Sequence, residues 1–190
     1  GRAEEKLGPV LRAVRDRFFL VTKCPTADYK RAWRYLRESM RKMQTDRIDL
    51  VHLHNFGQLS RFPDVRALFG KHGAVQALRE ARKQGLIRFI GCTGHLYPSR
   101  FKEALETGEI DVVMNVANYI TRHTYNFEQK VFALARKKNI ATVAMKVLGG
   151  RSPNVRTGKG IGYNIPPEHY ELAIRYAISI PGLSCAVIGM

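Results

Sequence analysis

The segment GLIRFIGCTGH at residues 85–95 decides the fold class. It joins a glycine suited to a helix end, Gly85, to the apolar run Ile87–Cys92 and then to polar residues. Runs without clean alternation of apolar and polar residues are typical of strands buried on both faces of a parallel sheet. Five further runs have the same character: Phe18–Lys23, Ile48–His54, Ile110–Val116, Ile140–Val147 and Ser184–Gly189.

Segments with helical periodicity separate these runs. Apolar residues step by three or four positions through 26–44, 72–85, 126–138 and 167–179, which is the spacing of one helix face. We expect Thr26 to cap the first of these helices. Strands that alternate with helices predict parallel pairing through crossovers, and hence an α/β fold. The spacing fits a doubly wound sheet or part of a (β/α)8 barrel, and alone it does not choose between them.

Composition excludes several classes of protein. The chain has 190 residues, of which 45% are hydrophobic and 25% charged, as in ordinary globular domains. No apolar run approaches the roughly 18 residues of a membrane-spanning helix, and no signal-peptide core follows the N-terminus. Three widely spaced cysteines predict reduced thiols in a cytoplasmic protein rather than a disulfide framework or a metal site. They are Cys24, Cys92 and Cys185.

The net charge is strongly positive, since 32 basic and 16 acidic residues give +16. This charge raises the possibility of a nucleic-acid-binding module. The basic residues are spread along the chain and fall largely on the polar faces of predicted helices. We therefore favour solvated helix faces over a nucleic-acid interface, although the charge can still steer anionic ligands toward the protein.

In either architecture, active groups gather at the carboxyl ends of the strands. Lys23 at such an end is either a buried cation that tunes an acid or a lysine whose ammonium reaches solvent. In the sequence HLH, alternation places His52 and His54 on the same face. A single histidine is more often structural than catalytic, and the glycine-rich basic loop 149–167 is a weak phosphate-binding signal. The strand ends also carry Thr93, Gly94, His95, Asn115, Asn118, Met145 and Lys146.

Taken together, these residues resemble those of the aldo/keto reductases. The most specific matches are RIDLVHLH at 47–54 and GLIRFIGCTGH at 85–95, and the form MKVLGG is similar to the bacterial predicted-oxidoreductase branch. The resemblance implies a (β/α)8 barrel, of which residues 1–190 would form a single domain of about six βα units, incomplete at both ends. The other motifs, in order, are AEEKLG at 3–8, FLVTK at 19–23, VVMNVANY at 112–119, VAMKVLGG at 143–150 and AIRYAISIPGLSCAVIGM at 173–190.

The same resemblance implies NAD(P)H-dependent reduction of aldehyde and ketone carbonyls, with NADP(H) favoured over NAD(H). By motif position, Lys23 and His54 match catalytic residues of the family. A lysine cation lowers the pKa of a nearby proton donor, and a histidine orients the carbonyl. Thr93 and Asn115 match positions that hold the nicotinamide carboxamide, and Met145 replaces a common aromatic residue. The remaining cofactor positions are Lys146, Gly149 and Gly150, and the loop 149–167 would lie against the pyrophosphate.

The resemblance also implies that some residues of the family's catalytic set are missing from this chain. Its catalytic Asp and Tyr belong to a segment that precedes Gly1, so we expect the isolated chain to lack turnover. We also expect exposed apolar residues at the first and last strands. The alternative function is a regulatory or interaction protein that binds the cofactor without catalysis. The expected ligand is a small-molecule carbonyl compound, with no membrane or metal, while the oligomeric state stays open.

Overall fold

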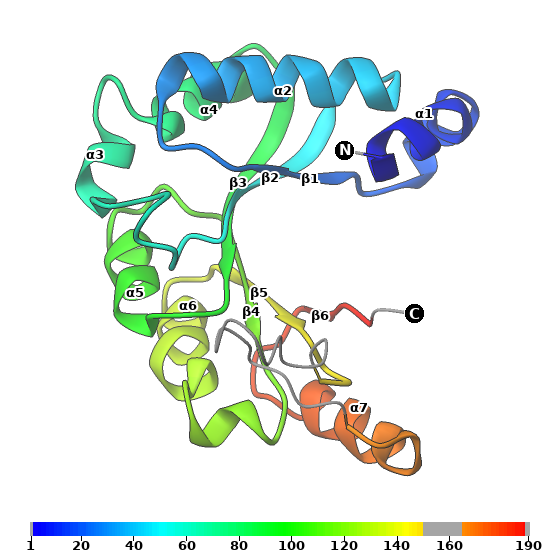
Figure 1. The fold of residues 1–190 in the computed structure, drawn as a ribbon, viewed down its shortest axis with the longest axis vertical. Coiled ribbons are helices and arrows are strands. Elements are labelled where there is room, and N and C mark those ends of the chain that lie inside the picture. The colour runs from blue at the N-terminus through cyan, green and yellow to red at the C-terminus, as the bar shows by residue number, and fades with distance from the viewer. Residues whose placement is uncertain (1, 150–164, 189–190) are drawn as a thin grey trace. The chain divides into compact units, whose positions relative to one another are not determined.

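The computed structural model describes residues 2–149 and 165–188 (Figure 1). It divides into two compact units, residues 1–92 and 93–190, which are described in turn. The strands are hydrogen-bonded in the order of the chain. They are β1 (Val21–Cys24), β2 (Ile48–His54), β3 (Ile87–Gly94), β4 (Val112–Val116), β5 (Ala141–Met145) and β6 (Cys185–Ala186). The α-helices are α1 (Arg2–Val14), α2 (Tyr29–Met43), α3 (Val65–Phe69), α4 (Ala74–Lys83), α5 (Pro98–Glu106), α6 (Ala133–Lys137) and α7 (Tyr170–Ile178).

Short helical turns complete the described structure. A π-helix, η3 (Glu128–Phe132), leads directly into α6. Three 3-10 helices join other elements: η1 (Arg15–Arg17), η2 (Thr121–His123) and η4 (Pro167–His169). The predicted helix at 126–138 is therefore a π-helical turn followed by an α-helix, and the one at 167–179 is a 3-10 turn followed by α7.

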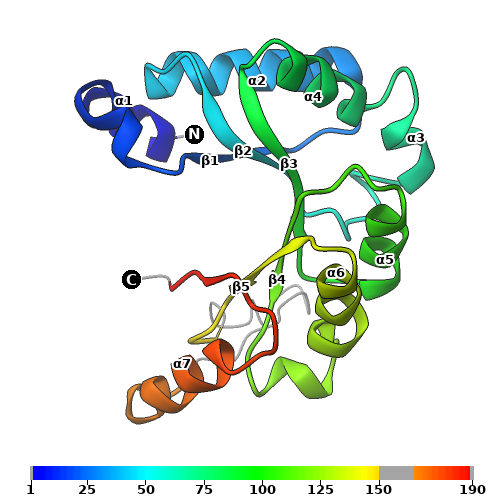
Figure 2. The ribbon, with the colours of Figure 1, turned by 180° about the vertical axis from the view of Figure 1, so that it is seen from behind.

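In the first unit, β1 and β2 pair in parallel, and the register sets Lys23 beside His52. Helices α2 and α4 pack side by side over these strands, as both ribbon views show (Figures 1 and 2). The cap of α2 differs from the prediction. The Asp28 carboxylate accepts from the Arg31 amide at 2.8 Å, while the Thr26 hydroxyl accepts from the Asp28 amide. The predicted Thr26 cap is therefore wrong, since Thr26 lies two residues before the N-cap.

Helix α4 ends as the sequence predicts. Gly85 adopts the left-handed conformation with φ 73°. Its amide donates to the Arg82 carbonyl and the Leu86 amide to the Ala81 carbonyl, both at 3.0 Å. This pair of bonds is a Schellman motif, which satisfies carbonyl groups that the helix end leaves free. The chain is thereby turned directly into β3.

In the second unit, β4 pairs with β5 and β5 with β6, in both cases in parallel. Helix α5 contacts α6, and α6 packs on β5. Ala173 and Ala177 of α7 are buried, as their helical spacing predicts. The apolar residues at helical spacing in 167–179 also include Leu172, which we expected to be buried with the alanines, but Leu172 is 58% exposed and this expectation is wrong. The buried face of α7 is narrow because it consists of Ala173 and Ala177, and Leu172 lies at the edge of this face.

Burial follows the predicted pattern for the middle strands only. Nearly every residue of β2, β3 and β4 is buried or nearly so. Strands β1 and β5 alternate between more exposed and buried positions, so the prediction of burial on both faces is wrong for them. The largest wholly buried side chains include five phenylalanines, namely Phe56, Phe62, Phe101, Phe127 and Phe132.

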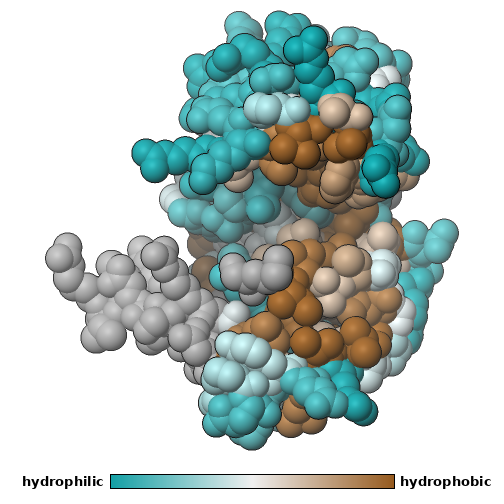
Figure 3. All heavy atoms as spheres, turned by 90° about the vertical axis from the view of Figure 1, so that its right-hand side faces the viewer, coloured by the Kyte–Doolittle hydropathy of each residue, from teal (hydrophilic) through white to brown (hydrophobic). Residues whose placement is uncertain are grey.

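Apolar side chains also reach the surface of each unit (Figure 3). Phe18, Phe19 and Val21 are exposed at and before β1, and Val187 and Ile188 directly after β6. The expectation of exposed apolar residues at the first and last strands is confirmed. Within the described residues, no helix has the length and apolar character needed to cross a membrane.

Candidate functional site

The first unit brings together three side chains at the carboxyl ends of β1 and β2. Lys23 lies in register with His52, and paired residues of parallel strands point to the same face. His54 lies two residues after His52 and shares that face as well. Lys23 is exposed, His52 wholly buried and His54 partly buried. The possibility of a buried cation at Lys23 is thus not realised, since its side chain is in contact with solvent.

His52 stands out for its missing hydrogen bonds. Neither Nδ1 nor Nε2 has a partner among the described residues, although the side chain is 0% exposed. Burial, together with the nearby Lys23 and His54, lowers the pKa of this imidazole to about 3. The ring is therefore neutral near pH 7. An unpaired buried donor or acceptor lowers the free energy of unfolding by about 1–3 kcal/mol, so a histidine at this core position destabilises the fold relative to an apolar residue.

The second unit holds a second group of predicted residues at the ends of β3, β4 and β5. The Asn115 amide donates from Nδ2 to the Gly94 carbonyl oxygen at 3.0 Å. Because Gly94 offers only an acceptor, this bond fixes which end of the amide carries oxygen. Oδ1 of Asn115 is buried and has no hydrogen-bond partner in the described structure. The side chain thus presents an unused acceptor within the unit.

Thr93 and Met145 lie next to each other in this unit. The Thr93 hydroxyl is 3.8 Å from the Met145 sulfur, a weak acceptor. Thr93 is buried, and Met145 is partly exposed. A hydroxyl bonded only weakly remains able to donate to a stronger acceptor such as a carbonyl oxygen.

Asn118 contrasts with Asn115 although both are buried amides on adjacent segments. Its Nδ2 donates to the Lys146 carbonyl at 2.8 Å, and its Oδ1 accepts from the amides of Ile120 and Thr121. Both ends of the Asn118 amide are therefore engaged in hydrogen bonds within the protein. It is a structural clamp that joins the turn after β4 to the end of β5.

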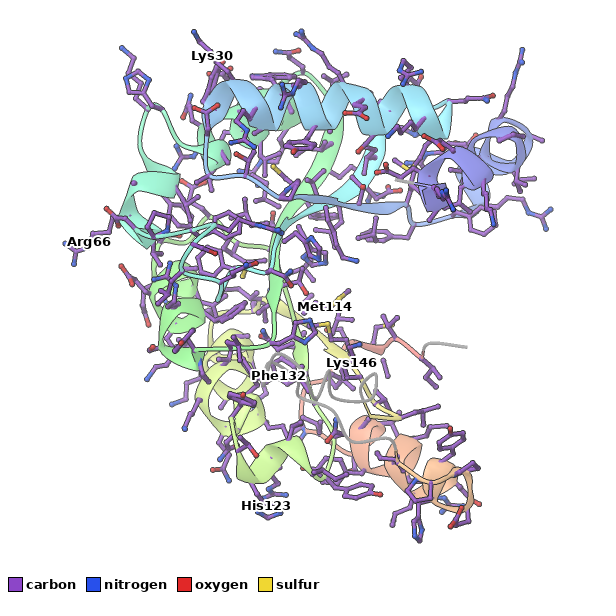
Figure 4. All side chains as sticks on the ribbon, viewed as in Figure 1. Lys30, Arg66, Met114, His123, Phe132 and Lys146 are labelled. Carbon is purple, nitrogen blue, oxygen red and sulfur yellow. The ribbon has the colours of Figure 1, made fainter. Side chains whose placement is uncertain are left out.

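Lys146 and Gly149 form the turn after β5. Lys146 is exposed, has φ 60° and accepts from the Gly149 amide at 3.0 Å (Figure 4). Gly149 has φ 90°, a conformation that disfavours side chains with a Cβ. This tight turn explains a glycine at 149. Gly150 and residues 150–164 of the predicted phosphate loop lie outside the described residues.

One open cleft lies away from the strand ends, between α2 and α4. It has a volume of about 360 Å³ and is lined by Tyr29, Lys30, Trp33, Arg37, Glu80 and Gln84. Lys30 points outward from the first turn of α2 (Figure 4). The Glu80 carboxylate already accepts from the Tyr29 hydroxyl and the Gln76 amide. None of the residues predicted for the site lines this cleft.

All three cysteines are free, with Cys24 and Cys92 buried and Cys185 exposed. Burial raises the pKa of the Cys24 thiol to about 11 and also raises that of Cys92. Buried thiols with raised pKa values are poor nucleophiles. Among the described residues, no group of three or more His, Cys, Asp or Glu side chains could hold a metal ion.

The fold agrees with that of known proteins. Residues 1–169 match the family model of the Aldo/keto reductase family. The chain therefore belongs to the aldo/keto reductase family. Methylglyoxal reductase DkgA of Yersinia pestis is 29% identical over 164 residues, which cover 83% of this chain and 52% of that protein. The chain thus spans about half the length of this curated relative.

Solved structures show the same fold. A Pseudomonas aeruginosa protein assigned to the aldo-keto reductases superimposes with a TM-score of 0.77 at 23% identity, covering 100% of this chain and 67% of that one. A Klebsiella pneumoniae aldo/keto reductase in complex with NADP and acetate gives 0.70 at 21% identity, covering 98% and 65%. The six-stranded α/β arrangement is therefore that of a partial (β/α)8 barrel, as predicted.

Proposed function

We propose that the protein to which this chain belongs is an oxidoreductase that reduces small aldehydes or ketones with a nicotinamide cofactor, NADPH rather than NADH. Family membership and the reductase named among the relatives support the reaction class. The structural observation that carries the proposal is the free Oδ1 of Asn115, a buried acceptor at the end of a strand. A bound nicotinamide dinucleotide would supply a hydride to the carbonyl carbon.

The donors and acceptors of the second unit fit a carboxamide. Such a group offers an N–H pair and a carbonyl oxygen. Oδ1 of Asn115 would accept from the N–H pair, while the Thr93 hydroxyl would donate to the carbonyl oxygen. The bond from Asn115 to Gly94 holds the amide in the orientation this requires. Met145 would contribute an apolar, polarizable surface beside the ring, where stacking by an aromatic side chain is absent.

In the first unit, Lys23 and His54 would act on the developing charge of the substrate oxygen. Reduction of a carbonyl builds negative charge on this oxygen, which requires a proton donor. The Lys23 ammonium would favour ionisation of that donor, and the His54 imidazole would orient the carbonyl by a hydrogen bond. Lys146, Gly149 and Gly150 would line the path of the cofactor beyond the nicotinamide.

The test of the proposed reaction measures oxidation of NADPH by the natural protein that carries this sequence, with small aldehydes such as methylglyoxal. We expect aldehyde-dependent oxidation that Lys23→Met and His54→Gln each reduce by at least about 100-fold, the usual scale for general acid–base residues. Lys30→Met, on the outer face of α2, serves as the matched control. Binding of NADPH without reduction of any carbonyl would support the regulatory alternative instead.

A further inference from the structure

The outer face of α2 carries a row of positive charges. Four basic residues follow one another at steps of four, three and four positions, so they lie within about 60° of one another around the helix axis and extend over about 16 Å. All four side chains are exposed, and Lys30 points outward (Figure 4). We call these residues the basic row: Lys30, Arg34, Arg37 and Arg41.

The basic row has no salt-bridge partner among the described residues. Glu38, the one acidic residue of α2, is bonded to Lys42 at 2.7 Å. Like charges at steps of three and four positions repel each other and destabilise a helix. A bound anion with several charges would remove this repulsion, so the row favours a ligand whose negative charges repeat along its length.

The open cleft between α2 and α4 adjoins the basic row, because Lys30 and Arg37 belong to both. The two helices pack side by side in both ribbon views (Figures 1 and 2). The cleft has a volume of about 360 Å³, and Tyr29 and Trp33 contribute aromatic rings to its wall. The Arg37 guanidinium lies 5.2 Å from the centre of the Trp33 ring. Aromatic surface and cations are therefore adjacent on this face of the first unit.

The acidic residue of the cleft separates the two kinds of ligand group. The Glu80 carboxylate accepts from the Tyr29 hydroxyl and from the Gln76 amide, so its negative charge is held in the cleft wall. This charge would repel a phosphate group inside the cleft but not an uncharged planar ring. Phosphates are therefore favoured on the basic row and an aromatic base in the cleft.

We propose that the basic row and the adjoining cleft bind single-stranded nucleic acid, with backbone phosphates on the row and a base stacked on the Trp33 ring. Proteins that bind single strands combine cations along the backbone with aromatic rings under the bases. An acidic polypeptide or an anionic lipid surface would leave the aromatic ring without a role. The spread of basic residues along the sequence favours solvated helix faces, but the packing of α2 on α4 adds the aromatic cleft that a purely solvated face does not need.

The first test measures the fluorescence anisotropy of a labelled oligothymidylate of about ten nucleotides with the natural protein that carries this sequence. For four phosphate contacts, the logarithm of the association constant should fall with the logarithm of the salt concentration with a slope of about −3. Removing three contacts should reduce this slope to about −1 and lower the affinity at low salt at least about tenfold. The variant for this step combines Arg34→Gln, Arg37→Gln and Arg41→Gln.

The matched control removes the same charge from exposed positions of the second unit. It combines Lys102→Gln, Lys130→Gln and Lys137→Gln. We expect this control to keep a slope close to that of the wild type, because none of its lysines belongs to the basic row. Equal losses of affinity in the two triple variants would overturn the proposal, as would an affinity that does not depend on salt.

The second test measures stacking. Trp33 is the single tryptophan of this chain, so tryptophan fluorescence reports on the cleft. We expect saturable quenching by oligothymidylate and none by inorganic polyphosphate, which carries the charges without the bases. Trp33→Leu should weaken oligothymidylate binding about tenfold, while Trp33→Tyr, which keeps an aromatic ring, should retain most of the affinity. Unquenched fluorescence at saturation, or equal affinity in wild type and Trp33→Leu, would overturn the proposal.

Competition distinguishes the other anionic partners. Polyglutamate, and vesicles of phosphatidylserine and phosphatidylcholine in equal parts, should each displace the labelled strand less than unlabelled oligothymidylate at equal charge concentration. Equal or better displacement by either competitor would overturn the proposal in favour of an acidic protein or a membrane surface. NADPH oxidation by the triple arginine variant should match that of the wild type, so this inference and the proposed function can fail separately.

Discussion

The side-chain amide of Asn115 donates to the carbonyl oxygen of Gly94 at 3.0 Å, and this bond leaves the amide oxygen buried without a partner. The bond ties the end of β4 to the end of β3 within the second unit. Buried polar groups are nearly always hydrogen-bonded. An unpaired amide oxygen at the carboxyl end of a strand therefore indicates a position where a ligand can bind.

Asp49 at the start of β2 is the clearest stabilising residue of the first unit. Its carboxylate accepts from the Leu20 amide and Arg15 at 2.8 Å and from Arg88 at 2.9 Å. We predict that Asp49→Asn lowers the free energy of unfolding by about 2–3 kcal/mol, because it removes the charge from a nearly buried network. Urea denaturation measures this. Asp46→Asn, at an exposed neighbouring position, should change stability by less than about 0.5 kcal/mol.

The same network predicts an acid-sensitive stability. Burial opposes ionisation of Asp49, but the Leu20 amide, Arg88 and Arg15 outweigh it and hold the pKa of this carboxyl below its ordinary value. A lowered folded-state pKa gives stability that is complete above the unfolded value, near pH 4, and is lost as the pH falls through the folded value. We expect denaturation midpoints to decline below about pH 4. Asp49→Asn should flatten this decline, and an equally steep decline in the variant would refute the assignment.

Gly85 tests the helix end that leads into β3. We predict that Gly85→Ala costs about 1 kcal/mol, because a Cβ is strained at positive φ. Space is not the cause, since nothing lies within 4 Å of the added Cβ. Gly70→Ala is the matched control, with φ −77° and an ordinary contact of 3.5 Å. Thermal unfolding of both variants decides the point, and equal effects would contradict it.

The cysteines should differ sharply in reactivity. Cys185 is exposed, whereas Cys24 and Cys92 are buried with raised pKa values. We predict that a thiol reagent modifies one cysteine per native chain at pH 8 and all three after denaturation. Peptide mass mapping identifies the site. Rapid modification of Cys92 in the native chain would show that the packing around β3 is looser than described.

Sequence patterns predict the strands well where burial alone decides them. The apolar run Ile48–His54 coincides with β2 at both ends. The first strand begins three residues later than predicted, at Val21, because Phe18 and Phe19 are apolar yet more than half exposed, at 52% and 55%. Composition identifies an apolar run, but only tertiary contacts decide which part of it pairs.

Side-chain environments are harder to predict than strand positions. Alternation correctly places His52 and His54 on one face, but it does not tell that His52 is wholly buried. Asn115 and Asn118 look equivalent in the sequence, but Oδ1 of Asn118 accepts from the nearby amides of Ile120 and Thr121, whereas Oδ1 of Asn115 has no partner in the described structure. The side-chain amides of both residues donate to distant carbonyls, those of Gly94 and Lys146, and long-range hydrogen bonds of this kind leave no local signal.

We propose that Asn115 and Thr93 hold the carboxamide of a nicotinamide cofactor. Equilibrium titration of this chain with NADPH, followed by the cofactor's own fluorescence, tests it most directly. We predict saturable binding that Asn115→Leu, of similar size, weakens about tenfold, as expected for one lost hydrogen bond. Thr93→Val should also weaken it, while Thr124→Val at an exposed position should not. Equal affinity in the wild type and Asn115→Leu, or no binding by the wild type, would contradict the account.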